Sequence, residues 1–195
     1  MFIYGENDKL KQLTNRCMLE TNCGGVILYG ETATGKTIYL HMLQKQLKEK
    51  KVEYIRGHDV MDDLYRTSAL SQEPCLDIAS ETKVVMIDNL EDFAGRMYIT
   101  QELLKLLKSN IETRLIICVA NNKNIAELLH KELNFEYISI SHVKPDMRIV
   151  QDKAVEKGIH LSEMQLNAFA NLESILELDA VLNKICFDKY LDEKK

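Results

Sequence analysis

The chain has 195 residues, of which 46% are hydrophobic and 28% are charged, and its net charge is −5. This composition is typical of a globular protein, and the length favours one domain or one domain with a small appendage. The acidic balance argues against a strong non-specific grip on nucleic acid, which normally appears as a basic patch, although a local patch would still permit DNA contact.

The cysteine pattern favours a reducing, cytoplasmic setting. The five cysteines are widely spaced and form no CxxC pair; they are Cys17, Cys23, Cys75, Cys118 and Cys186. Neither disulfide frameworks nor zinc sites have this pattern. The apolar run at the N-terminus is too short for a signal peptide, and no stretch approaches the roughly 20 apolar residues of a membrane span, so we expect no membrane partner.

Up to residue 141, short apolar runs alternate with stretches of helical periodicity. The expected strands are 25–29, 52–56, 83–88, 114–120 and 136–140, and the expected helices are 7–19, 36–48, 60–65, 98–110 and 125–132. Asp59 is expected to cap the helix over 60–65, whereas residues 67–82 match no element. Apolar runs of this kind are typical of strands buried on both faces. The alternation therefore predicts an α/β fold, with a parallel five-stranded sheet covered by helices on both faces.

The C-terminal part changes to helical periodicity alone. Pro145 suits the first turn of a helix that reaches residue 157. Ser162 and Gln165 form a capping-box pattern that begins another helix, and a final helix covers 175–190. We therefore expect an α/β subdomain over residues 1–142 and a small all-helical lid subdomain over residues 143–195.

A phosphate-binding loop stands between the first expected buried strand and the helix that follows it. The residues are Gly30, Glu31, Thr32, Ala33, Thr34, Gly35, Lys36 and Thr37, which match G-x-x-x-x-G-K-[ST]. In such a loop the glycines let backbone N–H groups turn toward phosphates, and the helix N-terminus adds positive charge. Lys36 then supplies a cation to the β- and γ-phosphates, and the Thr37 hydroxyl supplies a ligand to Mg²⁺. Because the loop has the required strand–loop–helix context, we prefer this interpretation to a chance match.

Asp88 is the expected second ligand of Mg²⁺. It ends the expected strand 83–88, at the sheet edge where ligands of parallel α/β sheets gather. An ordinary strand-ending aspartate is the alternative. The five histidines are scattered without ligand spacing, so no further metal site is expected. Together these motifs predict a protein that binds ATP or ADP with Mg²⁺.

The phosphate-binding core followed by a helical lid resembles the AAA+ ATPases, and the sequence from Asp88 onward resembles, more specifically, the DnaA replication-initiator family. The matching elements are Asp88–Asn89, Phe93–Ala94–Gly95–Arg96, Thr100–Gln101–Glu102, the run CVANNKNIAEL at 118–128, and the helical segments PDMRIVQDKAVEKGIHLSEMQLNAFA and LELDAVLNKI. The opening FIYGENDKL resembles the start of the family's ATPase domain, which implies that Phe2 and Ile3 flank the adenine. The resemblance covers nearly the whole chain and excludes the family's DNA-binding domain, a layout similar to that of Hda-type regulators.

Departures from the family pattern imply weak hydrolysis. Asn89 stands where the family has a second acid, and an amide cannot take a proton from water; Glu91 or Asp92 is an alternative acid. The sensor 1 residue falls on Asn121 or Asn122, so the resemblance assigns hydrolysis to Asp88, Asn89 and Asn122. The sensor 2 arginine of the lid maps to Leu176. No arginine occurs in 125–135, where the family has its arginine finger, and Lys131 is the nearest cation.

Three functions remain in competition. The first is an ATP-binding, DnaA-like regulator or accessory factor of DNA replication initiation, which binds another AAA+ protein such as a DnaA. The second is a true ATPase, either a helicase loader or a transposition helper of the DnaC/IstB kind. The third is a small-molecule kinase, which would need arginines clustered over the transferred phosphoryl group, whereas the six arginines of this chain are dispersed.

Overall fold

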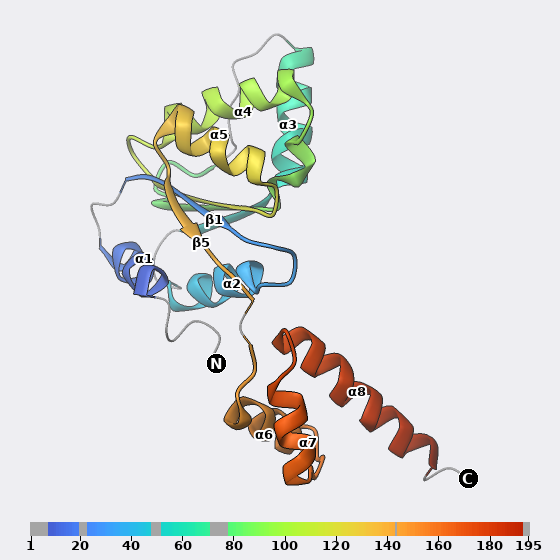
Figure 1. The fold of residues 1–195 in the computed structure, drawn as a ribbon. Coiled ribbons are helices and arrows are strands. Elements are labelled where there is room, and N and C mark those ends of the chain that lie inside the picture. The colour runs from blue at the N-terminus through green and yellow to red at the C-terminus, as the bar shows by residue number, and fades with distance from the viewer. Residues whose placement is uncertain (1–7, 20–22, 48–51, 71–77, 143, 193–195) are drawn as a thin grey trace. The chain divides into compact units, whose positions relative to one another are not determined.

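The computed structural model describes residues 8–19, 23–47, 52–70, 78–142 and 144–192, with two compact units. The first unit ends at Ile140 and the second comprises Ser141–Lys195. Each unit has its own hydrophobic core, and each is described separately below (Figure 1).

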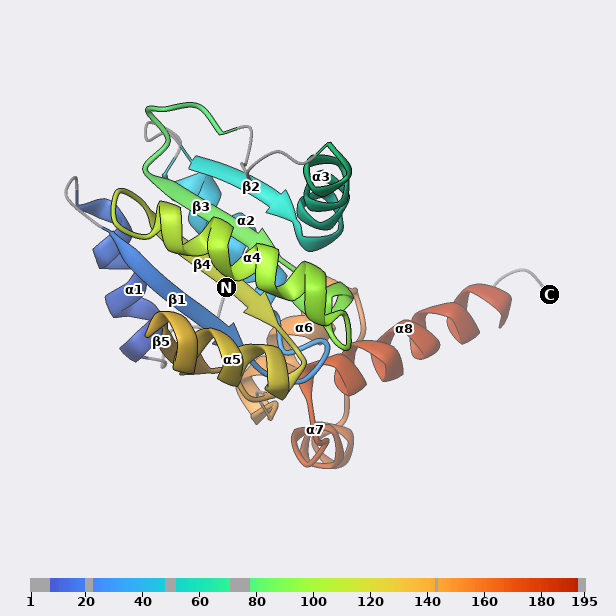
Figure 2. The ribbon, with the colours of Figure 1, turned by 90° about the horizontal axis from the view of Figure 1, so that it is seen from above.

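The first unit is built on a parallel five-stranded sheet, which confirms the predicted α/β fold. Its strands are β1 (Gly24–Tyr29), β2 (Val52–Arg56), β3 (Val84–Asp88), β4 (Leu115–Ala120) and β5 (Glu136–Ser139). They lie in the order β2-β3-β4-β1-β5, as Figure 2 shows from above. Every residue of β3 and β4 is buried, since both strands are covered from both sides. This explains why they appear in the sequence as unbroken apolar runs.

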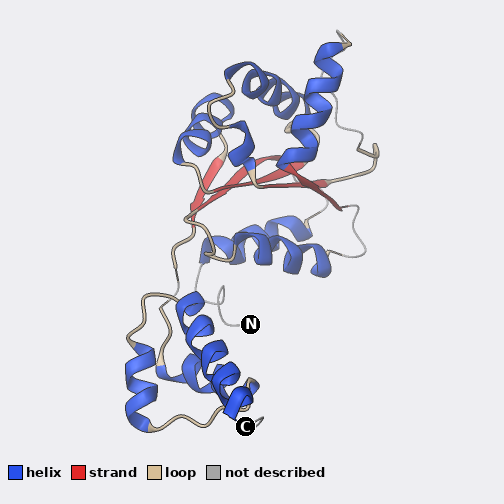
Figure 3. Cartoon of the chain, turned by 90° about the vertical axis from the view of Figure 1, so that its right-hand side faces the viewer, coloured by secondary structure: helices blue, strands red, loops and turns tan. Residues whose placement is uncertain are grey.

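Helices cover both faces of this sheet (Figures 1 and 3). One face carries α1 (Asp8–Met18) and α2 (Lys36–Gln46). The other carries α3 (Gly57–Ala69), α4 (Met97–Asn110) and α5 (Lys123–Leu133). Successive residues of a strand point to opposite faces, so each strand contributes to both clusters. Ile27, for example, packs under α5, whereas Leu28 packs with α1 and α2.

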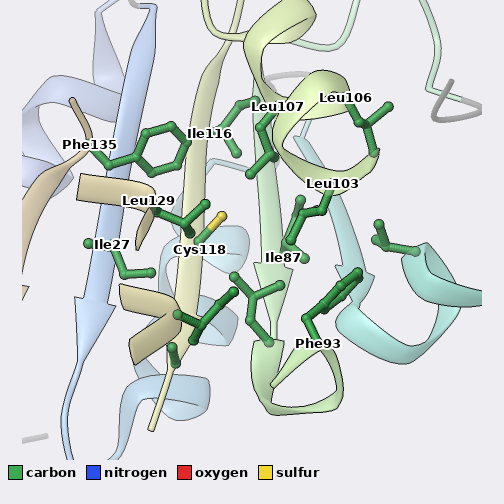
Figure 4. Close-up of a cluster of buried hydrophobic side chains, with 14 of the residues drawn as sticks. Ile27, Ile87, Phe93, Leu103, Leu106, Leu107, Ile116, Cys118, Leu129 and Phe135 are labelled. Atoms are coloured by element: carbon green, nitrogen blue, oxygen red, sulfur yellow. The ribbon is translucent and has the colours of Figure 1, made fainter. Parts of the chain in front are cut away.

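The cluster under α3, α4 and α5 is the larger of the two cores. Figure 4 shows Phe135 and Leu129 packed above Ile27 and Cys118, all of them fully buried. Burial strongly raises the pKa of the Cys118 thiol, so this cysteine behaves as a small apolar core residue.

The second unit consists of α6 (Met147–Glu156), α7 (Glu163–Ala170) and α8 (Ile175–Asp192) around a small core. The capping box is confirmed, because Ser162 and Gln165 bond each other's backbone. The expectation for Pro145 is wrong. Asp146 is the N-cap of α6 and accepts a hydrogen bond from the N–H of Ile149 at 2.7 Å. Pro145 therefore lies before the helix and outside its first turn.

Two further elements differ from the sequence expectation. The helix predicted over 60–65 begins at Gly57, directly after β2, and Asp59 lies in its first turn without serving as the cap. Gly57 permits this sharp junction, because a Cβ there would lie 2.3 Å from the Asn89 carbonyl oxygen. A 3₁₀ helix, η1 (Leu90–Phe93), follows β3 and had no signal in the hydrophobic pattern. Within the described residues, no helix combines the length and the apolar character that crossing a membrane requires.

Candidate phosphate-binding site

The candidate site lies where three neighbouring strands end. In the sheet, β4 lies between β1 and β3, and Tyr29 is paired with Ala120 at the ends of β1 and β4. The next residues along the chain are therefore Gly30 beyond β1 and Asn121 beyond β4, while Asp88 ends β3. Parallel strands direct their carboxyl ends to one edge, which is where ligands of open α/β sheets bind.

The loop Gly30–Thr37 joins β1 to α2, as expected. Gly30 is closely packed, because a Cβ at this position would lie 2.0 Å from the carbonyl oxygen of Ile140. Ala33 and Gly35 have positive φ angles of 64° and 88°. A left-handed conformation at alanine is costly, and such strain concentrates where a backbone is shaped for a ligand. Alternating backbone conformations of this kind turn N–H groups toward a common point, where an anion binds.

Lys36 is buried at the centre of this loop. Its ammonium donates hydrogen bonds to the carbonyl oxygens of Gly30 and Glu31, both at 2.7 Å, and to the Thr34 hydroxyl at 3.1 Å. Burial lowers the pKa of Lys36, and the nearby carboxylates of Glu91 and Asp88 oppose that shift. The cation thus lies within the electrostatic reach of two acids contributed by the end of β3 and by η1.

Asp88 is held by Tyr54 of the neighbouring strand β2. The Tyr54 hydroxyl donates to Asp88 Oδ2 at 2.8 Å. Burial, followed by this hydrogen bond, raises the pKa of Tyr54 to about 12. The other carboxylate oxygen, Oδ1, is buried and has no hydrogen-bond partner among the described residues. Buried charged oxygens require a compensating partner, and a hard divalent cation is a partner that suits a carboxylate.

We expect Tyr54→Phe to lower the free energy of unfolding by roughly 1–2 kcal/mol at neutral pH, because a hydrogen bond to a charged acceptor is lost. The pKa of Tyr54 in the folded protein lies above its usual value of 10.0. The stabilisation by Tyr54 is therefore fully present below pH 10 and is lost as the pH rises toward 12. Urea unfolding of both proteins between pH 7 and pH 11 measures this.

The exposed Tyr65 provides the control, since Tyr65→Phe is expected to change the stability by less than about 0.5 kcal/mol. An equal effect of the two substitutions, or a Tyr54→Phe effect that does not diminish above pH 10, contradicts the assigned hydrogen bond.

Glu91 is one of the two acids, with Asp92, that the sequence offers as an alternative to Asn89. One of its oxygens, Oε1, accepts a hydrogen bond from the backbone N–H of Asn121, at the end of β4. The other, Oε2, is buried without a hydrogen-bond partner among the described residues. In the structure, a 3₁₀ turn after Asp88 places residue 91 back against the sheet edge. That turn could not be recognised from hydrophobic periodicity.

The remaining residues predicted for metal binding and hydrolysis are Thr37, Asn89 and Asn122, and their surroundings differ. Thr37 is exposed at the start of α2. Asn89 is exposed and has a left-handed backbone, with φ 69°. Asn122 caps α5, its side-chain oxygen accepting from the N–H groups of Asn124 and Ile125.

Some of the remaining predictions fall beyond what the structure describes. Phe2 and Ile3 lie outside the described residues, and Leu176 lies in the first turn of α8. The roles given to these residues and to Thr37, Asn89 and Asn122 stay predictions.

A pocket of about 550 Å³ lies elsewhere in the first unit. It is lined by η1, the start of α4 and one side of α5, and it includes Gly95, Arg96 and Asn122. None of the loop residues Gly30–Thr37 lines it, and neither does Asp88. The pocket is therefore separate from the phosphate loop, although the Ala94–Gly95–Arg96 element contributes to its wall.

The fold and the loop define a P-loop ATPase of the AAA+ class. The family model of the AAA proteins, the ATPase family associated with various cellular activities, matches residues 26–138. This is more than half of the chain, and the protein belongs to this family.

The overall fold is that of the AAA+ domain of DnaA. Domain III of the Thermotoga maritima replication initiation protein DnaA has a TM-score of 0.71 at 15% identity, over 98% of this chain and 87% of that one. A replication initiator DnaA bound to AMPPCP and single-stranded DNA has a TM-score of 0.71 at 16% identity, over 99% and 66%. AMPPCP-bound DnaA from Aquifex aeolicus has a TM-score of 0.69 at 15% identity, over 93% and 62%. The chain thus spans about two thirds of the length of these two nucleotide-bound proteins.

Proposed function

We propose that this chain is an ATP-binding, DnaA-like AAA+ module that regulates or assists DNA replication initiation and hydrolyses ATP slowly. The observation that carries the proposal is the position of Lys36. Its ammonium lies inside a strained P-loop and within the electrostatic reach of Asp88 and Glu91. A cation beside a phosphate cradle and near carboxylates is the arrangement that P-loop ATPases use to hold a triphosphate and its metal.

Binding requires Lys36 to exchange its partners. In this structure its three hydrogen bonds go to the loop itself. Phosphate oxygens carry full negative charge, and charge-assisted hydrogen bonds to them are stronger than bonds to neutral carbonyl groups. A triphosphate therefore competes effectively for the ammonium. Membership of the AAA family and the AMPPCP bound by two DnaA proteins of the same fold support a nucleotide as the ligand.

The residues fit Mg²⁺ as the accompanying cation. Asp88 Oδ1 is a buried carboxylate oxygen without a hydrogen-bond partner among the described residues, and Thr37 follows Lys36 in the first turn of α2. These two residues would hold the ion together with phosphate oxygens. When bound, Mg²⁺ neutralises negative charge on the phosphates. Tyr54 contributes by holding Asp88 Oδ2, so that Oδ1 is left for the metal.

Two sequence departures argue for slow hydrolysis. Neither α5 nor Asn134–Phe135 contains an arginine, and the resemblance places leucine at position 176, where the DnaA family has its sensor 2 arginine. An arginine finger contributes roughly 10³–10⁵ in rate, so an ATPase without one turns over slowly. Such a protein keeps its bound ATP unhydrolysed for long periods, which suits a regulator that signals the bound state to a partner.

The partner that we propose is another AAA+ protein of the DnaA type. The likeness of the fold to that of DnaA proteins supports this assignment. No observation on charge supports a strong DNA interaction, since the net charge of the chain is −5.

Equilibrium binding tests the proposal. We expect ATP and ADP to bind with micromolar or tighter dissociation constants in the presence of Mg²⁺, with phosphate release far below the typical enzymatic rate of about 10 s⁻¹. In the same assay, adding a DnaA-type initiator is expected to change either the nucleotide affinity or the rate of phosphate release. Absence of nucleotide binding contradicts the proposal.

The alternative is a helicase loader or transposition helper of the DnaC/IstB kind. Turnover of about 1 s⁻¹ or faster by the protein alone, or stimulation by DNA instead of by a DnaA-type protein, favours that function. Phosphoryl transfer to a small acceptor would instead favour a kinase.

A further inference from the structure

Three acidic side chains follow one another closely at the end of β3, and they have different surroundings. Asp88 accepts a hydrogen bond from Tyr54. Asp92 lies with its carboxylate 3.9 Å from His58 of α3, at a partly exposed position. Glu91 accepts a hydrogen bond from the backbone N–H of Asn121, directly after β4. The short 3₁₀ helix separates the three acids, because its tight turn directs residues 91 and 92 to different sides.

Asn89 is a poor candidate for the base, because an amide cannot take a proton from water. It is exposed, its φ is 69°, and its carbonyl oxygen packs against Gly57 at the junction between β2 and α3. The position next to the metal acid, where the DnaA family has its second carboxylate, is therefore occupied by an exposed amide in this protein.

Glu91, in contrast to Asn89, is a carboxylate with one buried oxygen that has no hydrogen-bond partner among the described residues. This oxygen is Oε2, and the charge of the carboxylate acts on the Lys36 ammonium. Its Oε1 is fixed by a backbone N–H at the end of β4, the strand between β1 and β3. A carboxylate that is held by one oxygen leaves the other available to a ligand in the site, and the proximity of Lys36 locates that ligand near the phosphates.

We propose that Glu91 is the general base of ATP hydrolysis in this protein and takes the role that the acid following the metal ligand has in related ATPases. This proposal rests on the proposed function, because it requires ATP to occupy the loop Gly30–Thr37. A base must lie within hydrogen-bond reach of the proton that it removes, and a held carboxylate with one open oxygen meets that requirement.

The step balances with water as the second reactant. The Glu91 carboxylate accepts a proton from a water molecule as the water oxygen forms its bond to the γ-phosphorus. The bond from the γ-phosphorus to the β–γ bridging oxygen breaks, and its electron pair stays on that oxygen of ADP. Glu91 then releases the proton to solvent, and the products are ADP and inorganic phosphate.

The hydrogen bond from the Asn121 N–H to Glu91 couples the position of Glu91 to the start of α5. Because the backbone at the end of β4 holds the base, any shift at the start of α5 moves Glu91 relative to the phosphates. Asn122 caps α5 directly after this contact. The slow ATP hydrolysis expected of this protein then follows from the absence of the arginine finger and of the sensor 2 arginine, whereas the acid that activates the water is retained.

Single-turnover phosphate release with Mg·ATP and excess protein tests the proposal. We expect Glu91→Gln to keep the ATP dissociation constant within about threefold and to slow phosphate release by at least about 100-fold, the usual contribution of a general base. Glutamine retains an acceptor oxygen for the N–H of Asn121, so the fold should persist. Asp92→Asn is the matched control, because it removes an acid from the same 3₁₀ helix, and it is expected to release phosphate at the wild-type rate.

Several results would overturn the role of Glu91. The first is phosphate release by Glu91→Gln at the wild-type rate. The second is a slowing of phosphate release in Asp92→Asn that equals the slowing in Glu91→Gln. The third is a wild-type protein that binds ATP but releases no phosphate over many hours. The last result leaves the nucleotide-binding function standing, whereas absence of ATP binding by the wild type defeats that function itself. If Glu91→Gln does not fold, phosphate release by Glu91→Asp tests the role of Glu91 instead. A slower release at unchanged affinity supports the proposal, and a wild-type rate contradicts it.

Discussion

Replacing Lys36 by alanine is expected to weaken the binding of both ATP and ADP by about 100-fold or more. Lys36 is the cation at the centre of the loop, and its three hydrogen bonds to loop atoms become available to phosphate oxygens. Each charge-assisted bond contributes about 1.5–3 kcal/mol, and every 1.4 kcal/mol corresponds to a tenfold change in affinity. Titration calorimetry with each nucleotide in the presence of Mg²⁺ measures the effect.

The control for Lys36→Ala is Lys45→Ala, in the last turn of the same helix α2, where the side chain is exposed. It removes the same charge from the protein, and it is expected to leave both affinities within about twofold, since exposed charges at this distance are screened by salt. Circular dichroism shows whether Lys36→Ala stays folded. A folded Lys36→Ala protein that binds ATP with wild-type affinity refutes the phosphate site assigned to Gly30–Thr37.

Replacing Phe135 by alanine is expected to lower the free energy of unfolding by about 3–5 kcal/mol, the usual effect of removing a buried aromatic ring. Phe135 is fully buried between α5 and β1 (Figure 4). Gly25 makes room for the ring, because a Cβ at that position would lie 2.1 Å from it. Because Phe135 packs closely against Gly25, few neighbouring atoms can move into the cavity that the substitution leaves. Urea unfolding measures the loss.

Met97→Ala is the control for Phe135→Ala, because Met97 is 78% exposed at the start of α4 in the same unit. Its loss of stability is expected to remain within about 0.5 kcal/mol. A Phe135→Ala protein that loses less than about 1 kcal/mol would show that the cavity collapses, and it would contradict the tight packing between Phe135 and Gly25.

The sequence by itself determined the class of the fold. Buried parallel strands need apolar side chains on both faces, so β3 and β4 appear as unbroken apolar runs that can be recognised without any tertiary information. The phosphate loop is equally local, because its glycines, Lys36 and Thr37 occupy consecutive positions between one strand and one helix. The capping box of α7 is local for the same reason. Family membership follows from these local patterns, and the family model confirms it.

The tertiary structure decided the surroundings of the polar side chains that follow Asp88. Asn89, Glu91 and Asp92 lie within four positions of one another in the sequence, and hydrophobic periodicity does not separate them. Their directions depend on one 3₁₀ turn, on the close approach of Gly57 to Asn89, and on a hydrogen bond from Asn121 of a different strand. The bond from Tyr54 to Asp88 likewise depends on the pairing of β2 with β3. Contacts between strands that are distant along the chain have no signature in a single sequence, because only folding brings those backbones and side chains together.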